Sequence, residues 1–216
     1  AKREDILEGR EPQEYSDSYL ETLAVYRKIA EALVDHDTIL MHGSVVAVDG
    51  EAYLFTAKSG TGKSTHTRYW REGFGARAVM VNDDKPLLKL TEDGVLACGT
   101  PWDGKHRLSE NVCLPLKGIC ILERGKENRI RRISPEEALP MLLHQSYCPL
   151  DENKRDAFES QVKKLYQHMT VWDFVEFLEK NPNAIFRYNG SPNGILEMCL
   201  KFGMEEFVDY EKGKII

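Results

Sequence analysis

The fold of this chain is decided by Ala57-Lys58-Ser59-Gly60-Thr61-Gly62-Lys63-Ser64-Thr65, which follows the β-rich run 52–55 and precedes a stretch able to form a helix. Gly60 and Gly62 permit backbone φ > 0, which turns successive N–H groups toward an anion. Lys63 adds a positive charge, and Ser64 offers a hydroxyl suited to Mg²⁺. A helix beginning here points its positive dipole end at the phosphates. The stretch is therefore predicted to bind a nucleotide through Ser59, Gly60, Thr61, Gly62, Lys63, Ser64 and Thr65.

One position departs from the phosphate-loop pattern, which has Gly where this chain has Ala57. A Gly-rich surface turn could contain such a run by accident. The strand before the loop and the helix after it favour nucleotide binding over that alternative. Ala57 is the residue at which reduced or altered activity is expected.

Composition narrows the class of protein. The 216 residues are 42% hydrophobic, enough for a proper core, and the net charge of −6 argues against a nucleic-acid-binding surface. No apolar run approaches the ~20 residues of a membrane span, and no secretion signal follows the N-terminus. We expect neither nucleic acid nor membrane as a partner. The oligomeric state stays open, a homo-oligomer included.

The five cysteines, Cys98, Cys113, Cys120, Cys148 and Cys199, are odd in number and never form Cys-x-x-Cys. That pattern suggests neither a disulfide framework nor a zinc ribbon. Free thiols in a reducing cytoplasm are expected.

A hairpin is predicted before the loop. Asp49-Gly50 separates the β-rich runs 39–48 and 51–56, which is a strong two-residue turn signal. In that register the numbers of paired residues sum to 99, so His42 lies opposite Ala57. His42 is thereby predicted to lie at the mouth of the phosphate loop.

A second strand, 76–81, ends in Asn82-Asp83-Asp84. If it runs parallel to the strand entering the loop, both end at the same carboxyl edge, where ligands bind in α/β sheets. Ser64 with one of Asp83 and Asp84 can then hold Mg²⁺ while the other carboxylate serves as base. The stretch 99–118 is predicted to be a loop that covers the phosphates, and it contains Lys105, Arg107 and Lys117. These cations are available to offset negative charge in the transition state.

The remaining patterns predict a mixed sheet with helices. Helices are expected at 16–34, 135–145 and 151–169, antiparallel strands at 87–90 and 94–97, a buried strand at 119–123, a turn at 125–128 and a return strand at 129–133. Residues 171–178 fit either strand or helix, and 194–202 is helix-like. We expect a single α/β domain over 1–216 with a mixed central β-sheet, a nucleotide-binding core at 38–133 and a mainly helical C-terminal extension at 134–216.

These residues carry a family resemblance. Met41-His42-Gly43-Ser44, the hairpin, the loop and the early Asn82-Asp83-Asp84 resemble the nucleotide-binding core of HPr kinase/phosphorylase and ATP-dependent phosphoenolpyruvate carboxykinase, over residues 38 to about 125. The segment Thr100-Pro101-Trp102-Asp103-Gly104-Lys105 resembles small HPr-kinase-related proteins.

The resemblance implies ATP and Mg²⁺ as cofactors and transfer of the γ-phosphoryl group to a hydroxyl, with Ser of an unidentified protein or peptide as acceptor. It implies that His42 lies near the γ-phosphate or the metal, that Asp84 is a metal ligand and that Asp83 is the base. Lys117-Gly118 would correspond to the Arg-Gly segment of the kinases. This chain has Thr65 where those kinases carry Glu, and its 216 residues are expected to leave no room for the additional N-terminal domain of the carboxykinases. Carboxykinase-like activity on a small carboxylate and ATP binding without turnover are the alternatives.

Overall fold

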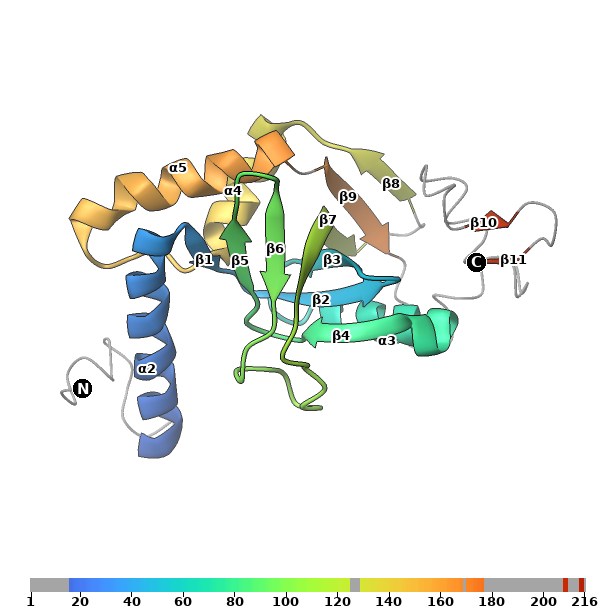
Figure 1. Cartoon of the computed structure of the whole chain (residues 1–216), viewed down its shortest axis with the longest axis horizontal. Coiled ribbons are helices and arrows are strands. Elements are labelled where there is room, and N and C mark those ends of the chain that lie inside the picture. Colours follow the sequence, from blue (N-terminus) through green and yellow to red (C-terminus); the bar gives the residue numbers. More distant parts are fainter. Residues whose placement is uncertain (1–15, 125–128, 169, 177–207, 210–213, 216) are drawn as a thin grey trace.

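The chain folds into a mixed β-sheet flanked by helices, in a computed structural model that describes residues 16–124, 129–168, 170–176, 208–209 and 214–215 (Figure 1). The main sheet contains β1 (Thr38–Leu40), β2 (Gly43–Val48), β3 (Glu51–Thr56), β4 (Ala78–Asn82), β5 (Leu87–Leu90), β6 (Val95–Cys98), β7 (Cys113–Arg124), β8 (Arg129–Arg132) and β9 (Thr170–Glu176). The helices are α2 (Asp17–Leu33), α3 (Lys63–Phe74), α4 (Pro135–Gln145) and α5 (Glu152–His168), with short 3₁₀ turns η1 (Val34–His36) and η2 (Gly75–Arg77). A separate pair, β10 (Val208–Asp209) and β11 (Lys214–Ile215), is antiparallel. The predicted mixed α/β class is confirmed.

The order β1-β5-β6-β7-β3-β2-β4 brings three strand ends to one edge. β2 is antiparallel to both β3 and β4, so β3 and β4 run in the same direction, and β7 is parallel to β3. The predicted hairpin register is confirmed, with Val48 opposite Glu51 and Gly43 opposite Thr56. The carboxyl ends of β3, β4 and β7 therefore share the edge that carries the phosphate loop.

β7 joins two parts of the sheet because its two edges pair differently. One edge pairs with β3, while the other pairs first with β6 and then with β9. The predicted return strand is wrong in its partner, since β8 pairs with β9 and not with β7. The strand β9 lies between them and runs parallel to β7, so residues 171–176 of the ambiguous segment 171–178 form a strand. The predicted loop 99–118 is also too long, because β7 begins at Cys113.

The two faces of β3 meet different helices, as strand alternation requires. Ala52 and Leu54 belong to the main core, to which α4 contributes Leu142 and α5 Phe158. On the other face, Phe55 packs against His66 and Trp70 of α3, with ring centroids 4.3 and 5.3 Å apart. His66 is 1% exposed and accepts from Trp70 Nε1, so it is a core residue.

The predicted helix starts are confirmed by their caps. Ser16 Oγ accepts from the Tyr19 amide at the start of α2. Ser134 and Glu137 form a reciprocal capping box at the start of α4, with Pro135 in the first turn. α5 also forms where expected, whereas the helix-like segment 194–202 and the turn 125–128 lie outside the described residues. Within the described ranges, no helix combines the length and apolar character needed to cross a membrane.

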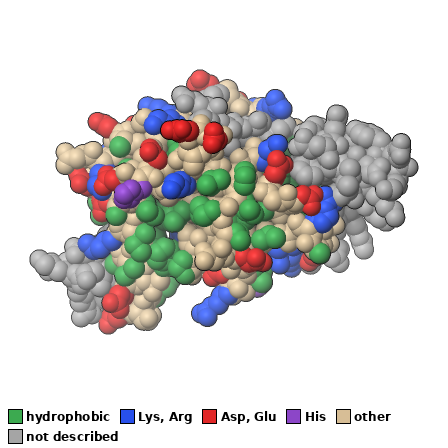
Figure 2. Space-filling model, in the orientation of Figure 1, with side chains coloured by type: hydrophobic (Ala, Val, Ile, Leu, Met, Phe, Trp, Pro, Cys, Tyr) green, Lys and Arg blue, Asp and Glu red, His purple; other side chains and the backbone are tan. Residues whose placement is uncertain are grey.

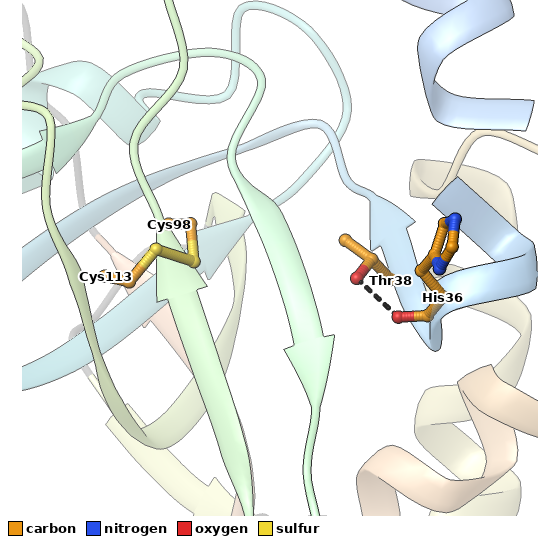
Figure 3. Close-up of a disulfide and its surroundings, with 4 residues drawn as sticks. All are labelled: His36, Thr38, Cys98 and Cys113. Carbon is orange, nitrogen blue, oxygen red and sulfur yellow. Dashed lines mark hydrogen bonds between the residues drawn. A yellow bond between two sulfur atoms is a disulfide. The ribbon is translucent and has the colours of Figure 1, made fainter. Parts of the chain in front are cut away.

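The expectation of free thiols is wrong for two of the cysteines. The antiparallel register sets Cys98 at the end of β6 opposite Cys113 at the start of β7, and the two form a disulfide (Figure 3). This pairing arises from the sheet, so sequence spacing gives no hint of it. The bond closes the base of loop 99–112. Cys120 is a buried thiol and Cys148 an exposed one, while Cys199 lies outside the described residues.

Candidate active site

The segment predicted to be a phosphate loop, residues 57–65, lies between β3 and α3. Gly60 and Gly62 adopt φ of 77° and 126°. The first intrahelical bond of α3 runs from the His66 amide to the Gly62 carbonyl, 2.9 Å apart, so the amides of residues 63–65 precede it and have no acceptor within the helix. Three N–H groups at a helix N-terminus suit a phosphate.

Ala57 does not strain this loop. It is fully buried, and its backbone is outside the left-handed region that would require Gly. Its carbonyl accepts from Lys63 Nζ over 2.9 Å. The structure therefore offers a reason why Ala is tolerated at this position.

Lys63 is folded back over its own loop. Its side chain is buried, and Nζ donates to the carbonyls of Ala57 and, at 3.4 Å, Lys58. Burial lowers the pKa of Lys63, while Asp84 and Asp83 oppose that shift and Lys85 adds to it. The opposing effect of the two carboxylates places the aspartate pair within electrostatic reach of Lys63.

Arg124 is a contact to the loop that nothing local in the sequence marks. It is the last residue of β7, and its guanidinium donates to the Thr61 carbonyl over 3.2 Å and to the Gly60 carbonyl. Both carbonyls therefore point outward, toward β7. Because the N–H groups on either side of them can then face the opposite way, Arg124 supports the anion-binding shape of the loop.

Asp83 is held from two sides. Ser44 Oγ donates to Asp83 Oδ1 over 2.7 Å and lies 2.8 Å from Thr67 Oγ1 on α3. The second carboxylate oxygen, Oδ2, lies against Gly104: a Cβ at that glycine would be 2.8 Å from it. Asp83 is only 8% exposed, so Gly104 and the loop around it cover this carboxylate.

Asp84 is more open, since its side chain is 39% exposed. Its Oδ1 accepts from Lys85 Nζ over 3.2 Å and lies 3.6 Å from His42 Nε2. The turn is fixed by Asn82, whose side-chain oxygen accepts from the amides of Asp84 and Lys85 and whose amide group donates to Thr100. Asn82 is fully buried, and both the oxygen and the nitrogen of its side-chain amide are hydrogen-bonded. These bonds fix the backbone at Asp84 and so the position of its side chain.

His42 lies beside the loop, as the hairpin register predicts. Thr56 Oγ1, at the end of β3, donates to the His42 carbonyl over 2.9 Å. His42 Nδ1 lies 2.8 Å from Gln145 Oε1 at the end of α4. Burial, then the charges of Lys85 and Lys63, lower the pKa of His42, so the neutral imidazole is favoured.

The predicted cations separate into two groups. Lys105 and Arg107 are exposed in loop 99–112, on either side of His106 and directly after Gly104. Lys117 was predicted to join them, and that placement is wrong. It lies on β7 and pairs with Glu51 at the opposite end of β3 from the phosphate loop. Its neighbour Gly118 also lies within the strand.

Trp102 packs rather than facing an open site. Its ring lies 5.8 Å from that of Tyr26 on α2. Burial raises the pKa of Tyr26, Arg27 counteracts that shift and the charge of Asp84 adds to it. The ring contact between Tyr26 and Trp102 places α2 beside loop 99–112. On the face drawn in Figure 2, basic and acidic side chains are interspersed and form no single basic stripe.

The donors present fit a magnesium nucleotide. The amides of residues 63–65 and Lys63 suit phosphate oxygens, and hydroxyl and carboxylate oxygens, here Ser64 and Asp84, are ligands that Mg²⁺ prefers. Mg²⁺ usually retains waters and takes few protein ligands. The described residues hold no cluster of three or more His, Cys, Asp or Glu side chains able to bind a metal by themselves.

Comparisons with known proteins give limited information. No protein-family model matches the chain, and no curated protein matches it. Among solved structures, a match is found to the Hpr(Ser) kinase/phosphatase from Coxiella burnetii, at 12% sequence identity and a TM-score of 0.41, covering 77% of this chain and 94% of that one. These values are too low to show a family, and the proposal below rests on the residues of the site.

Proposed function

We propose that this protein is an ATP- and Mg²⁺-dependent phosphotransferase that moves the γ-phosphoryl group to a hydroxyl, with Ser of a protein or peptide as the favoured acceptor. One observation carries the proposal: Ser44 Oγ bonds Asp83 and lies 2.8 Å from Thr67 Oγ1. Because the Ser44 proton goes to Asp83, Thr67 Oγ1 is the donor in that contact, and the same hydroxyl lies 3.3 Å from the Lys63 carbonyl in the first turn of α3. Hydrogen bonds therefore connect the helix end that carries the amides of residues 63–65 to the Asp83 carboxylate, and phosphoryl transfer needs both groups.

Each residue has a chemical role in this proposal. Lys63 and the loop amides would hold the phosphates, and Ser64 and Asp84 would hold Mg²⁺, which would offset phosphate charge. Asp83 takes the proton of the acceptor hydroxyl as the new O–P bond forms and ADP leaves. The bond from Ser44 fixes the orientation of that carboxylate. Lys105 and Arg107, exposed in the loop that covers Asp83, would supply positive charge.

A second candidate is an ATP-binding module without turnover, and the cover over Asp83 favours it. Gly104 lies against the oxygen that a substrate hydroxyl would have to reach. Catalysis therefore requires loop 99–112 to move when the acceptor binds, whereas nucleotide binding does not.

The test combines binding and transfer. The wild-type protein is titrated with Mg-ATP by calorimetry and incubated with γ-labelled ATP and a lysate of its own cells, after which labelled products are identified. Lys63→Met is expected to abolish ATP binding, with Lys58→Met, an exposed neighbour, as matched control. Asp83→Asn is expected to retain ATP affinity and to lower the rate of phosphoryl transfer by roughly 10²- to 10⁴-fold, the usual contribution of a general base.

Three results would redirect the proposal. Unchanged ATP affinity in Lys63→Met would show that the loop is not the phosphate site. Normal binding together with no transfer to any protein, metabolite or water would establish the binding module. ATP consumption that depends on oxaloacetate and releases CO₂ would identify a carboxykinase-like enzyme instead.

A further inference from the structure

Gln145, the last residue of α4, is bonded to His42 through both its backbone and its side chain. The His42 amide donates to the Gln145 carbonyl over 2.7 Å, and His42 Nδ1 lies 2.8 Å from Gln145 Oε1. Gln145 is 5% exposed although its side chain is polar. A buried amide that faces an imidazole ring beside the proposed active site requires a structural or functional reason.

The position of Gln145 does not depend on the His42 ring. Residues 145–147 run beside 40–42 like a short extra strand: Met41 and Ser146 form an antiparallel bridge, and the Tyr147 amide donates to the Leu40 carbonyl over 2.9 Å. The Ser146 hydroxyl also donates to the Leu142 carbonyl at the end of α4. These hydrogen bonds fix the backbone at Gln145, so its side-chain amide lies next to the His42 imidazole.

The environment of the ring decides which nitrogen carries the proton. With Gln145 Oε1 facing Nδ1, that nitrogen is the donor, and Nε2 keeps its lone pair. Nε2 is 3.6 Å from Asp84 Oδ1, beyond hydrogen-bond distance, and that oxygen already accepts from Lys85. The Lys85 ammonium donates to that Asp84 oxygen over 3.2 Å, so a cation as well as a carboxylate lies near Nε2. A cation near Nε2 favours a lone pair there over an N–H.

We propose that Gln145 is a positioning residue that holds His42 in the Nδ1–H tautomer, so that Nε2 is presented as a hydrogen-bond acceptor toward the position beside Asp84. A water or hydroxyl bound there would donate to Nε2. The catalytic meaning of this arrangement rests on the proposed phosphotransfer, while the tautomer itself does not.

The second end of the amide provides a control. Gln145 Nε2 bonds His144 Nδ1 over 2.7 Å, and His144 is exposed on α4. The exposed ring can take either tautomer, so it does not dictate the orientation of the Gln145 amide. Removing His144 leaves both bonds to His42 in place. The variant His144→Ala therefore separates the role of the amide from that of its outer neighbour.

The primary experiment is ¹⁵N NMR of the full-length protein with labelled histidine, without ligand, at about pH 8, where an imidazole is neutral. His42→Gln assigns the signals. The wild type is expected to show protonated Nδ1 and unprotonated Nε2, and His144→Ala is expected to keep that pattern. Gln145→Leu, which retains the backbone bonds, is expected to give averaged shifts of a tautomer mixture. Gln145→Glu retains an acceptor oxygen and is expected to restore the Nδ1–H signature.

Kinetics provide the second readout. Gln145→Leu is expected to lower kcat by roughly 10- to 100-fold, the size of effect seen when a hydrogen-bond partner that orients a metal-ligating histidine is removed, with KM for ATP changed less than about threefold. Gln145→Glu is expected to recover most of kcat. A wild-type spectrum with the proton on Nε2, or a Gln145→Leu spectrum identical to the wild type, overturns the inference. If the tautomer is as expected and no phosphotransfer occurs, only the proposed function fails.

Discussion

Gly104→Ala tests whether the cover over Asp83 controls chemistry. The glycine has no left-handed φ, so its backbone accepts a side chain. The new Cβ would lie 2.8 Å from Asp83 Oδ2 and 3.1 Å from the Asp83 carbonyl, and ordinary contact begins at 3.4 Å. Either the carboxylate or the loop must therefore move by about 0.6 Å, the difference between 3.4 and 2.8 Å.

The carboxylate cannot move without a cost. Asp83 Oδ1 accepts from the buried Ser44 hydroxyl over 2.7 Å, and hydrogen bonds to charged groups contribute about 1.5–3 kcal/mol. A displacement approaching 1 Å at a reacting group can lower the rate by about 10²-fold. We expect Gly104→Ala to lower phosphotransfer by roughly 10- to 100-fold and to change ATP affinity by less than about twofold, because the three atoms nearest to the added Cβ all belong to Asp83 and none to Lys63 or the loop amides.

The assay measures initial rates of transfer and, separately, ATP affinity by calorimetry. His106→Ala, two residues along the same loop and exposed, is the matched control and is expected to behave like the wild type. Full activity in Gly104→Ala would refute the displacement of the Asp83 carboxylate by the added Cβ and show that the loop moves instead. A parallel loss of ATP affinity would refute the separation of the base from the phosphate cradle.

Three further perturbations have defined outcomes. Arg124→Gln is expected to weaken ATP binding by roughly 3- to 10-fold in calorimetry, because two loop carbonyls lose their donor, while Arg124→Lys should retain part of the affinity; equal affinities would contradict this. Cys98→Ser with Cys113→Ser is expected to lower the free energy of unfolding by up to about 3 kcal/mol in urea melts, given a closed loop of 15 residues; an unchanged midpoint would count against the disulfide. Burial raises the pKa of Cys120 to about 12, above its unfolded value of 9.0, so the unfolded chain releases this proton at lower pH than the folded chain. The free energy of unfolding should therefore fall by about 1.4 kcal/mol per pH unit from about pH 9 upward. Cys120→Ala should lack this decrease, and the same dependence of stability on pH in the variant and the wild type would refute the argument.

The parts of the fold that the sequence predicts are those encoded locally. Asp49-Gly50 sets the hairpin register because the turn type fixes which residues face each other. Ser16 and Ser134 mark helix starts because each bonds amides only three residues away. Asp83 and Asp84 are placed at the loop edge by the direction of β4 alone. The chemical roles of these site residues remain predictions for the experiments above.

The parts that could not be predicted depend on long-range pairing. β9 enters between β7 and β8 from about 50 residues along the chain, and no local pattern distinguishes this from a simple hairpin. Arg124 and Gln145 reach the site only because β7 and α4 end beside it. Cys98 and Cys113 pair because two strands set them opposite each other. In each case the fold brings these residues together, and their spacing in the sequence does not predict the contact.

The antiparallel strand β2 explains why the site can form from so short a stretch of chain. Because β2 runs opposite to β3 and β4, its amino end lies at the same edge as their carboxyl ends. His42 and Ser44 therefore arrive beside Lys63 and Asp83 without any crossover. The Ser44 hydroxyl lies between Thr67 and Asp83 only in this register, since shifting β2 by one residue would turn Ser44 to the opposite face. The hairpin turn thus determines the geometry of the proposed catalytic pair as well as that of the sheet.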